Sequence, residues 1–230
     1  MEDFKIHSKF SHLEKGISPI RICLDVNDEK GNEDEFVKKF KENADTPYKG
    51  ADLSGKLVSH VMSPVNSRNK YSENYYVCDG VVAVGVDRST GENISFLTHE
   101  NPNYTMTDEI ESFDKKLTEK LEEIKSLSKN NSVDVVSFGG SKDFNKEDDV
   151  QFEESMQKIS EVCYKVLGFY PTVAQGPKHK GVGYRNVYFD TENRRLYMYS
   201  PVLKSEKQKE DFKLPEMKER MDDIKEELNQ

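Results

Sequence analysis

Two runs of β-branched and aromatic residues on either side of a polar turn constrain the fold of this sequence more than any other stretch. "VVAVGVD" (81–87) is followed by "RSTGEN" and then by "ISFLTH" (94–99). Val, Ile and Phe favour strands, and a short Gly-containing polar segment connects adjacent antiparallel strands. Residues 81–99 are therefore predicted to form a β-hairpin.

Helical periodicity follows this hairpin. Apolar residues at steps of three and four from Ile110 to Leu127 predict an amphipathic helix over 107–128, with Thr107 as its N-cap. A second stripe predicts a helix over 150–167 that places Cys163 in the core and ends at Gly168. The remaining segments are predicted strands: "SVDVVSFGG", "YPTVAQG" and the hairpin "RNVYFDTENRRLYMYSP".

The two ends of the chain give weaker signals. "SPIRICLDVND" predicts a strand with Cys23 opposite its apolar face, "NEDEFVKKFKENADTP" a short charged helix, and the Ser-, Gly-, Asn- and Pro-rich residues 51–70 a long loop. Near the C-terminus, Pro215 and a stripe from Met217 to Leu228 predict an amphipathic helix. That helix docks on its own domain or contacts a partner or a second copy.

This order of elements predicts an α/β (α+β) sandwich of mixed β-sheet with two long helices and a closing C-terminal β-hairpin. We expect three parts. Residues 1–71 form an N-terminal extension that is partly irregular, residues 72–203 form the domain, and residues 204–230 form the C-terminal helix.

Composition narrows the classes of function. The 230 residues include 43 Asp and Glu against 34 Lys and Arg, a net charge of −9, which disfavours a general nucleic-acid binder. No apolar run approaches the roughly 20 residues that span a bilayer, and the first residues do not resemble a secretory signal. Three widely spaced cysteines form neither a disulfide framework nor a zinc site. We expect a cytoplasmic protein with reduced thiols, no metal or other cofactor, and no nucleic acid or membrane as partner.

The order and spacing of these motifs resemble the chemoreceptor glutamine deamidase (CheD) family. The resemblance rests on "VVAVGVD", "TGEN", "FLTHENP", the helix over 107–128, "VVSFGG", the helix over 150–167, "LGFYPTVAQG" and the closing hairpin, and it covers about residues 72–200. It implies a CheD-like sandwich. It also implies a cysteine nucleophile and a histidine base that deamidate glutamine in a protein substrate, so that the partner is a protein; the oligomeric state is left open.

The resemblance places His99 at the family's catalytic histidine. When "VVAV" is aligned without gaps, however, the family's cysteine falls on Gly80, and Cys78 stands two residues earlier. Ser72 stands six residues before Cys78, where the family has a threonine. Two residues of extended chain keep a side chain on the same face but move it by about 6.6 Å. A turn or bulge at Asp79–Gly80 would absorb that displacement.

Two functions remain open. In the first, the Cys78 thiolate attacks a glutamine carboxamide, His99 transfers the protons and Ser72 orients the imidazole. Gly139 and Gly140 would then let the substrate and the backbone approach closely. In the second, Cys78 is a small apolar strand residue, His99 and Ser72 are loop residues, and the protein is a catalytically inactive CheD-like scaffold that binds other proteins.

Overall fold

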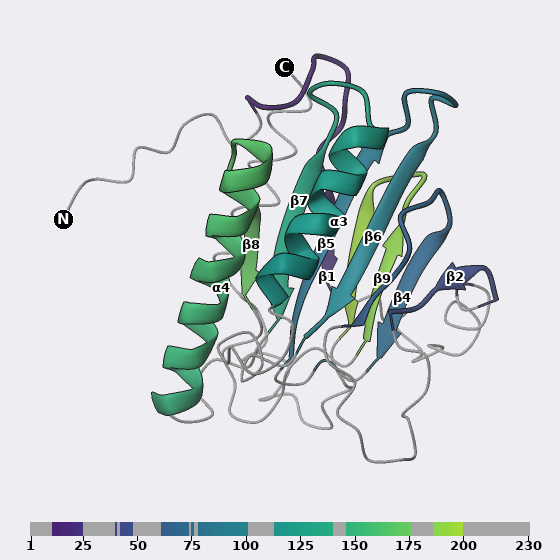
Figure 1. Cartoon of the computed structure of the whole chain (residues 1–230). Coiled ribbons are helices and arrows are strands. Elements are labelled where there is room, and N and C mark those ends of the chain that lie inside the picture. Colours follow the sequence, from purple (N-terminus) through teal and green to yellow (C-terminus); the bar gives the residue numbers. More distant parts are fainter. Residues whose placement is uncertain are drawn as a thin grey trace.

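The computed structural model of the chain is a sandwich of three layers, in which two helices cover one sheet and a second sheet lies behind it (Figure 1). It describes residues 11–24, 40, 42–47, 61–73, 75, 78–100, 113–139, 146–175 and 186–199. No helix in this part of the chain is long and apolar enough to cross a membrane.

The central sheet has the strand order β3-β6-β5-β7-β8. Its strands are β3 (Val61–Met62), β6 (Asn93–His99), β5 (Asp79–Val86), β7 (Asp134–Gly139) and β8 (Thr172–Gln175). β5 pairs antiparallel with both β6 and β7, whereas β7 and β8 are parallel. The predicted hairpin is confirmed as β5–β6.

The second sheet, here called the outer sheet, has the order β1-β10-β9-β4-β2. Its strands are β1 (Arg21–Leu24), β10 (Arg195–Tyr199), β9 (Asn186–Asp190), β4 (Asn69–Glu73) and β2 (Ala44–Asp45). β9 and β10 form the predicted closing hairpin. β1 joins the sheet by parallel pairing with β10, and β4 by antiparallel pairing with β9.

Alternation along β5 separates two cores. Val81 and Ala83 face the helices α3 (Phe113–Leu127) and α4 (Lys146–Leu167), while Val82 and Val84 face the outer sheet. Because successive side chains of a strand point to opposite faces, a strand covered on both faces is apolar throughout, as "VVAV" is. The predicted α+β sandwich is confirmed. Cys163 is fully buried in the helix–sheet core, as expected.

The segment before β1 is fixed by two buried charged residues. Asp134 at the start of β7 accepts a hydrogen bond from the Ile20 amide at 2.7 Å and one from His12 at 3.2 Å. Arg194 donates to the carbonyl oxygens of Ser18 and Ser132, each at 3.0 Å. These contacts hold the chain against both sheets before it enters β1.

The first 73 residues differ most from the expectation. Described parts of this segment supply β1, β2 and β4 to the outer sheet and β3 to the central sheet, so they are integral to the sandwich. The predicted boundary at residue 72 cuts through β4, and the predicted loop over 51–70 contains β3 and the start of β4. At the end of the predicted charged helix, Ala44–Asp45 form β2 instead. Two-residue strands are too short to show a period-2 pattern.

Several sequence predictions fall outside the described residues. They concern Thr107, Gly140, most of the charged helix and the whole C-terminal helix over 204–230. The side chain of Cys23 is also outside them, although its backbone belongs to β1.

Candidate functional site

His99 ends β6, and its side chain lies on the face of the central sheet that meets the outer sheet. Its Nδ1 atom is 2.9 Å from the Oγ atom of Ser72, which lies on β4 of the outer sheet and is fully buried. Burial lowers the pKa of His99 to about 4, because a protonated imidazole would lose hydration there. The imidazole is therefore neutral at pH 7, and Ser72 fixes its orientation.

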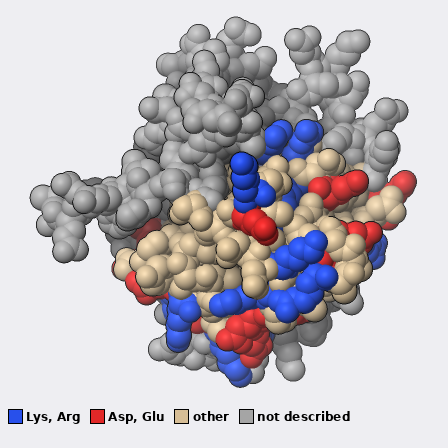
Figure 2. Space-filling model, turned by 90° about the horizontal axis from the view of Figure 1, so that it is seen from above, with Lys and Arg blue, Asp and Glu red and all other residues tan. Residues whose placement is uncertain are grey.

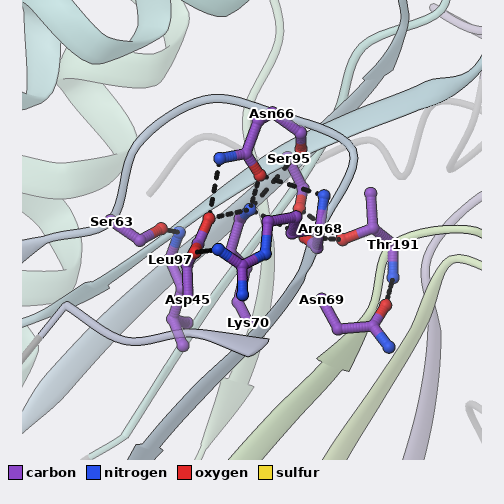
Figure 3. Close-up of polar contacts among 9 residues, drawn as sticks. All are labelled: Asp45, Ser63, Asn66, Arg68, Asn69, Lys70, Ser95, Leu97 and Thr191. Atoms are coloured by element: carbon purple, nitrogen blue, oxygen red, sulfur yellow. Dashed lines mark hydrogen bonds and ion pairs between the residues drawn. The ribbon is translucent and has the colours of Figure 1, made fainter. Parts of the chain in front are cut away.

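A network of polar side chains joins β4 to β6, the strands that carry Ser72 and His99 (Figure 3). At its centre Lys70, two residues before Ser72, donates to Asn66 Oδ1 at 2.6 Å and to the Arg68 carbonyl oxygen at 2.7 Å. The carboxylate of Asp45 binds Arg68 at 2.9 Å and accepts from Asn66 Nδ2 at 2.7 Å. Burial lowers the pKa of Lys70 to about 8, and Asp45 opposes that shift.

Further contacts of this network reach β6 directly. The Thr191 hydroxyl donates to the Arg68 carbonyl oxygen at 2.8 Å and lies 2.7 Å from the hydroxyl of Ser95 on β6. The Leu97 amide donates to Ser63 Oγ at 2.9 Å. Lys70 and its partners thus join β4 and β6, strands of two different sheets, through short polar contacts (Figure 3).

Tyr75 covers the imidazole of His99. The two rings are stacked, with centroids 4.1 Å apart and planes 13° from parallel. The Tyr75 hydroxyl donates to the Thr98 carbonyl oxygen at 2.6 Å. Burial raises the pKa of Tyr75 well above its ordinary value, and a hydrogen bond with Ser72 opposes the shift. Sequence reasoning missed Tyr75, since one more aromatic residue in "NYYV" carries no signal of such a role.

Gly80 lies opposite His99 across the β5–β6 ladder. The pairings Asp79–Glu100 and Val82–Leu97 fix this register. A Cβ atom at Gly80 would lie 2.4 Å from Phe138 Cζ and 2.9 Å from Tyr75 Cε1, both far inside van der Waals contact. The place that the resemblance gives to the nucleophile is therefore filled by two aromatic rings.

Cys78 lies outside the strand, directly before β5, and is half-buried. Its amide donates to the Tyr75 carbonyl oxygen. The bulge considered at Asp79–Gly80 is not formed, because both residues pair regularly with Gly139 and Phe138 of β7. None of the described hydrogen bonds joins the Cys78 thiol to His99.

The surroundings of Cys78 do not activate its thiol. Burial raises the pKa of Cys78 to about 12, and the carboxylates of Asp79 and Glu100 raise it further, because each disfavours the thiolate. Reactive cysteines show the opposite shift, towards or below neutral pH. The thiol is therefore protonated at pH 7.

Gly139 ends β7 in close contact with the backbone of Cys78 and Asp79. Its φ of 126° lies in the region that favours glycine, and a Cβ there would lie 2.3 Å from the Cys78 carbonyl oxygen. Only glycine lets the end of β7 approach the Cys78–Asp79 peptide. Ser72, His99, Gly139 and the backbone of Cys78 thus lie at the same end of the sandwich.

Asp79 is a second residue that sequence reasoning missed. Its fully buried carboxyl accepts a hydrogen bond from Ser155 of α4 through Oδ2, and its Oδ1 atom has no hydrogen-bond partner among the described residues. Burial raises the pKa of Asp79 to about 8, and the Ser155 bond opposes that shift. The sequence "DG" predicted a turn, whereas Asp79 is a buried acid in the first position of β5.

No group of three or more His, Cys, Asp and Glu side chains in the described part of the chain is placed to bind a metal ion. No known family model matches the sequence, and no curated protein matches it at a significant level.

Proposed function

We propose that the chain is a catalytically inactive CheD-like scaffold that acts as a protein-binding module in the cytoplasm. One observation carries the proposal: Gly80 lies opposite His99, and the rings of Tyr75 and Phe138 fill the place of a side chain there. A thiol at this position would have the hydrogen-bond reach to an imidazole that nucleophilic catalysis needs. At Gly80 the rings of Tyr75 and Phe138 leave no room for such a thiol, and the thiol that the chain does have, at Cys78, has a raised pKa.

The proposed binding role is supported by the contacts around His99 that are formed although no activated nucleophile accompanies them. The Ser72–His99 bond, the Tyr75 stack and the Lys70 network are formed without an activated nucleophile beside them. A preserved sandwich without its chemistry still presents surfaces of fixed shape to a partner. The charge of −9 favours a protein over a nucleic acid as that partner.

The test is the rate of Cys78 alkylation by iodoacetamide between pH 6 and 9, read by peptide mass spectrometry so that Cys23 and Cys163 are resolved separately. Because alkylation requires the thiolate, Cys78 should react at least about tenfold more slowly in the folded protein than in guanidinium. His99→Gln should leave that rate unchanged, with thermal melting as the control for folding. Fast alkylation at neutral pH that slows in His99→Gln would overturn the proposal.

A protein-glutamine deamidase acting through Cys78 and His99 is the second candidate, and the Ser72–His99 bond of 2.9 Å favours it. In such an enzyme a hydroxyl on Nδ1 fixes the imidazole so that Nε2 serves as the base for the thiol. The hydrogen bond between the Cys78 amide and the Tyr75 carbonyl oxygen would have to rearrange to bring Cys78 to that atom. Release of ammonia from a glutamine-containing protein, lost in Cys78→Ser and in His99→Gln, would establish this candidate.

A further inference from the structure

Lys70 is the only fully buried lysine among the described residues, and its amine lies against the carboxamide of Asn66. The Nζ atom of Lys70 is 2.6 Å from Asn66 Oδ1. Because a C=O bond is about 1.2 Å long, Nζ lies no more than about 3.8 Å from the carboxamide carbon Cγ. Reacting atoms stand about 3–3.5 Å apart before a bond forms between them. The amine is therefore a short movement away from a carbon that it can attack.

Burial gives this amine a reactivity that exposed lysines lack. Figure 2 shows Lys and Arg side chains at the surface of the molecule, beside Asp and Glu. Water solvates such ammonium groups and keeps them charged, and a charged amine has no lone pair for attack. Burial lowers the pKa of Lys70 to about 8, while Asp45 opposes that shift and Arg68 adds to it. Roughly a tenth of the Lys70 side chains are therefore neutral at pH 7.

The carboxamide of Asn66 is polarised by a second donor. The Arg68 amide donates to Oδ1 at 2.9 Å, so this oxygen accepts hydrogen bonds from the backbone as well as from Lys70. Attack at Cγ would move negative charge onto Oδ1, and a fixed N–H group stabilises such an oxyanion. The backbone of Asn66 is held in turn by a bridge to Ser95 of β6. The contacts of Asn66 thus present Cγ to the amine.

Asp45 contacts both nitrogen atoms that such a reaction involves. Asn66 Nδ2 donates to Asp45 Oδ2 at 2.7 Å, and Lys70 Nζ lies 3.5 Å from the same oxygen. Asp45 Oδ1 binds Arg68 at 2.9 Å, which orients the carboxylate. A carboxylate oxygen between an attacking and a leaving nitrogen can take a proton from the first and give it to the second. The need of a buried lysine for acceptors explains the contacts of Nζ, but not why one oxygen also binds the nitrogen that would leave.

We propose that Lys70 and Asn66 react to form an intramolecular isopeptide bond, with Asp45 transferring the proton between the two nitrogens. Neutral Nζ attacks Cγ, and the electrons of the C=O double bond move onto Oδ1 beside the Arg68 amide. Asp45 accepts a proton from Nζ and passes it to Nδ2. The Cγ–Nδ2 bond then breaks, the C=O double bond re-forms and ammonia leaves. The reaction needs no other reactant.

The new bond would close a ring over residues 66–70, where the chain passes from the central sheet to the outer sheet (Figure 3). Asn66 is bridged to β6, and Lys70 belongs to β4. Lys70 would lose its charge, while Asp45 would keep Arg68 as its cationic partner. The inference goes beyond the proposed binding role and does not depend on it, because neither Cys78 nor His99 takes part.

Mass spectrometry of the purified protein, kept folded for several days at pH 7 and at pH 9, tests the inference. We expect the intact mass to fall by one ammonia, about tenfold faster at pH 9, because the neutral fraction of Lys70 rises through its pKa of about 8. Trypsin cleaves after Arg68, so the product should appear as a branched peptide that joins residues 57–68 to residues 69–88. This peptide should not form in guanidinium, where the fold no longer holds the side chains together.

Two variants separate the roles of the side chains. Lys70→Arg keeps the cation but removes the nucleophile, and it should abolish the branched peptide. Asp45→Asn keeps the size of the side chain but cannot transfer the proton, and it should slow the reaction by about a hundredfold or more. The matched control is Lys120→Arg in α3, which should react like the wild type. Thermal melting at both pH values shows whether each protein is folded.

Two results would overturn the inference. One is a wild-type protein that stays folded at pH 9 and keeps its full mass. The other is a loss of ammonia that persists in Lys70→Arg or is confined to an unbranched peptide 57–68, since Asn66 would then have formed a succinimide with the Ser67 amide. The peptide map of the wild type gives this answer even if a variant does not fold.

Discussion

Gly80 and His99 are cross-strand neighbours, yet the aromatic ring that contacts the imidazole comes from Tyr75, outside both strands. The absence of a Cβ at Gly80 gives the rings of Tyr75 and Phe138 room against β5. One glycine thus decides which group accompanies the imidazole. The effect of a side chain at Gly80 on the stability of the protein can therefore be measured.

Gly80→Ala should lower the free energy of unfolding by about 1–3 kcal/mol, because the added methyl group overpacks the core against Phe138. The cost should fall in a Phe138→Leu background, which removes the atoms nearest to the new methyl group. Urea unfolding of the two single variants and the double variant measures this coupling. Strict additivity would show that the two residues do not compete for the same space.

Asp79 should make the protein less stable as pH rises. Its pKa is about 8 in the folded chain against an ordinary 3.8, so between these values the unfolded chain releases a proton that the folded chain retains. Stability from this group is complete below pH 4 and is lost towards pH 8. Asp79→Asn should remove this dependence of stability on pH. Its free energy of unfolding should exceed that of the wild type by an amount that grows between pH 4 and pH 8 to on the order of 2 kcal/mol.

Ser155→Ala is the companion variant for Asp79. Its hydroxyl hydrogen bond lowers the pKa of Asp79, so its loss should raise that pKa and extend the decline in stability above pH 8. Thermal melting at a series of pH values measures the stability of both variants. Identical slopes in wild type and Asp79→Asn would contradict a buried, proton-retaining carboxyl.

Lys70→Met should cost about 1–3 kcal/mol of stability at pH 7, because Asn66 Oδ1 and the Arg68 carbonyl oxygen lose a buried donor. The folded pKa of Lys70 is about 8 against an ordinary 10.5, so its contribution to stability rises with pH between these values. The variant should lose that rise. Lys120→Met, on the partly exposed surface of α3, is the control and should change stability by less than about 0.5 kcal/mol.

His99 should titrate near pH 4, which NMR of its ring protons measures directly. An ordinary histidine has a pKa of 6.5, so the unfolded chain takes up a proton that the folded chain refuses as pH falls from 6.5 to 4, and stability declines over that range. Tyr75→Ala uncovers the imidazole and should move its pKa back towards 6.5. A wild-type value near 6.5 would mean that the ring is not buried as described.

Local periodicity predicted the parts of the fold in which neighbouring residues act together. The alternation in "VVAVGVD" and "ISFLTH" and the stripes of α3 and α4 depend on burial that repeats along one element. β2 and β3 have two residues each and join their sheets only through distant partners, so no repeat exists to detect. Gly80 was assigned to a possible turn or bulge, whereas close packing of Phe138 is what requires glycine there.

The candidate site shows a second limit. Ser72 and His99 were linked through the resemblance, and they do lie within hydrogen-bond distance, but on strands of different sheets. The contacts that join those strands run through Lys70, Asn66 and Thr191, polar residues with no periodic pattern. Tyr75 and Asp79 were missed for the same reason, since burial of a single polar group leaves no trace in a local pattern.

The pairing of β1 with β10 determines the order in which the layers can form during synthesis. All five strands of the central sheet have left the ribosome once Gln175 has been released. β1, by contrast, can pair with β10 only after Arg195–Tyr199 have been synthesised. Until then Ile20 and Ile22, which are buried in the finished protein, have no outer sheet to enter. A ribosome paused before β9 would therefore hold a helix-covered sheet with its other apolar face bare, a state suited to capture by chaperones.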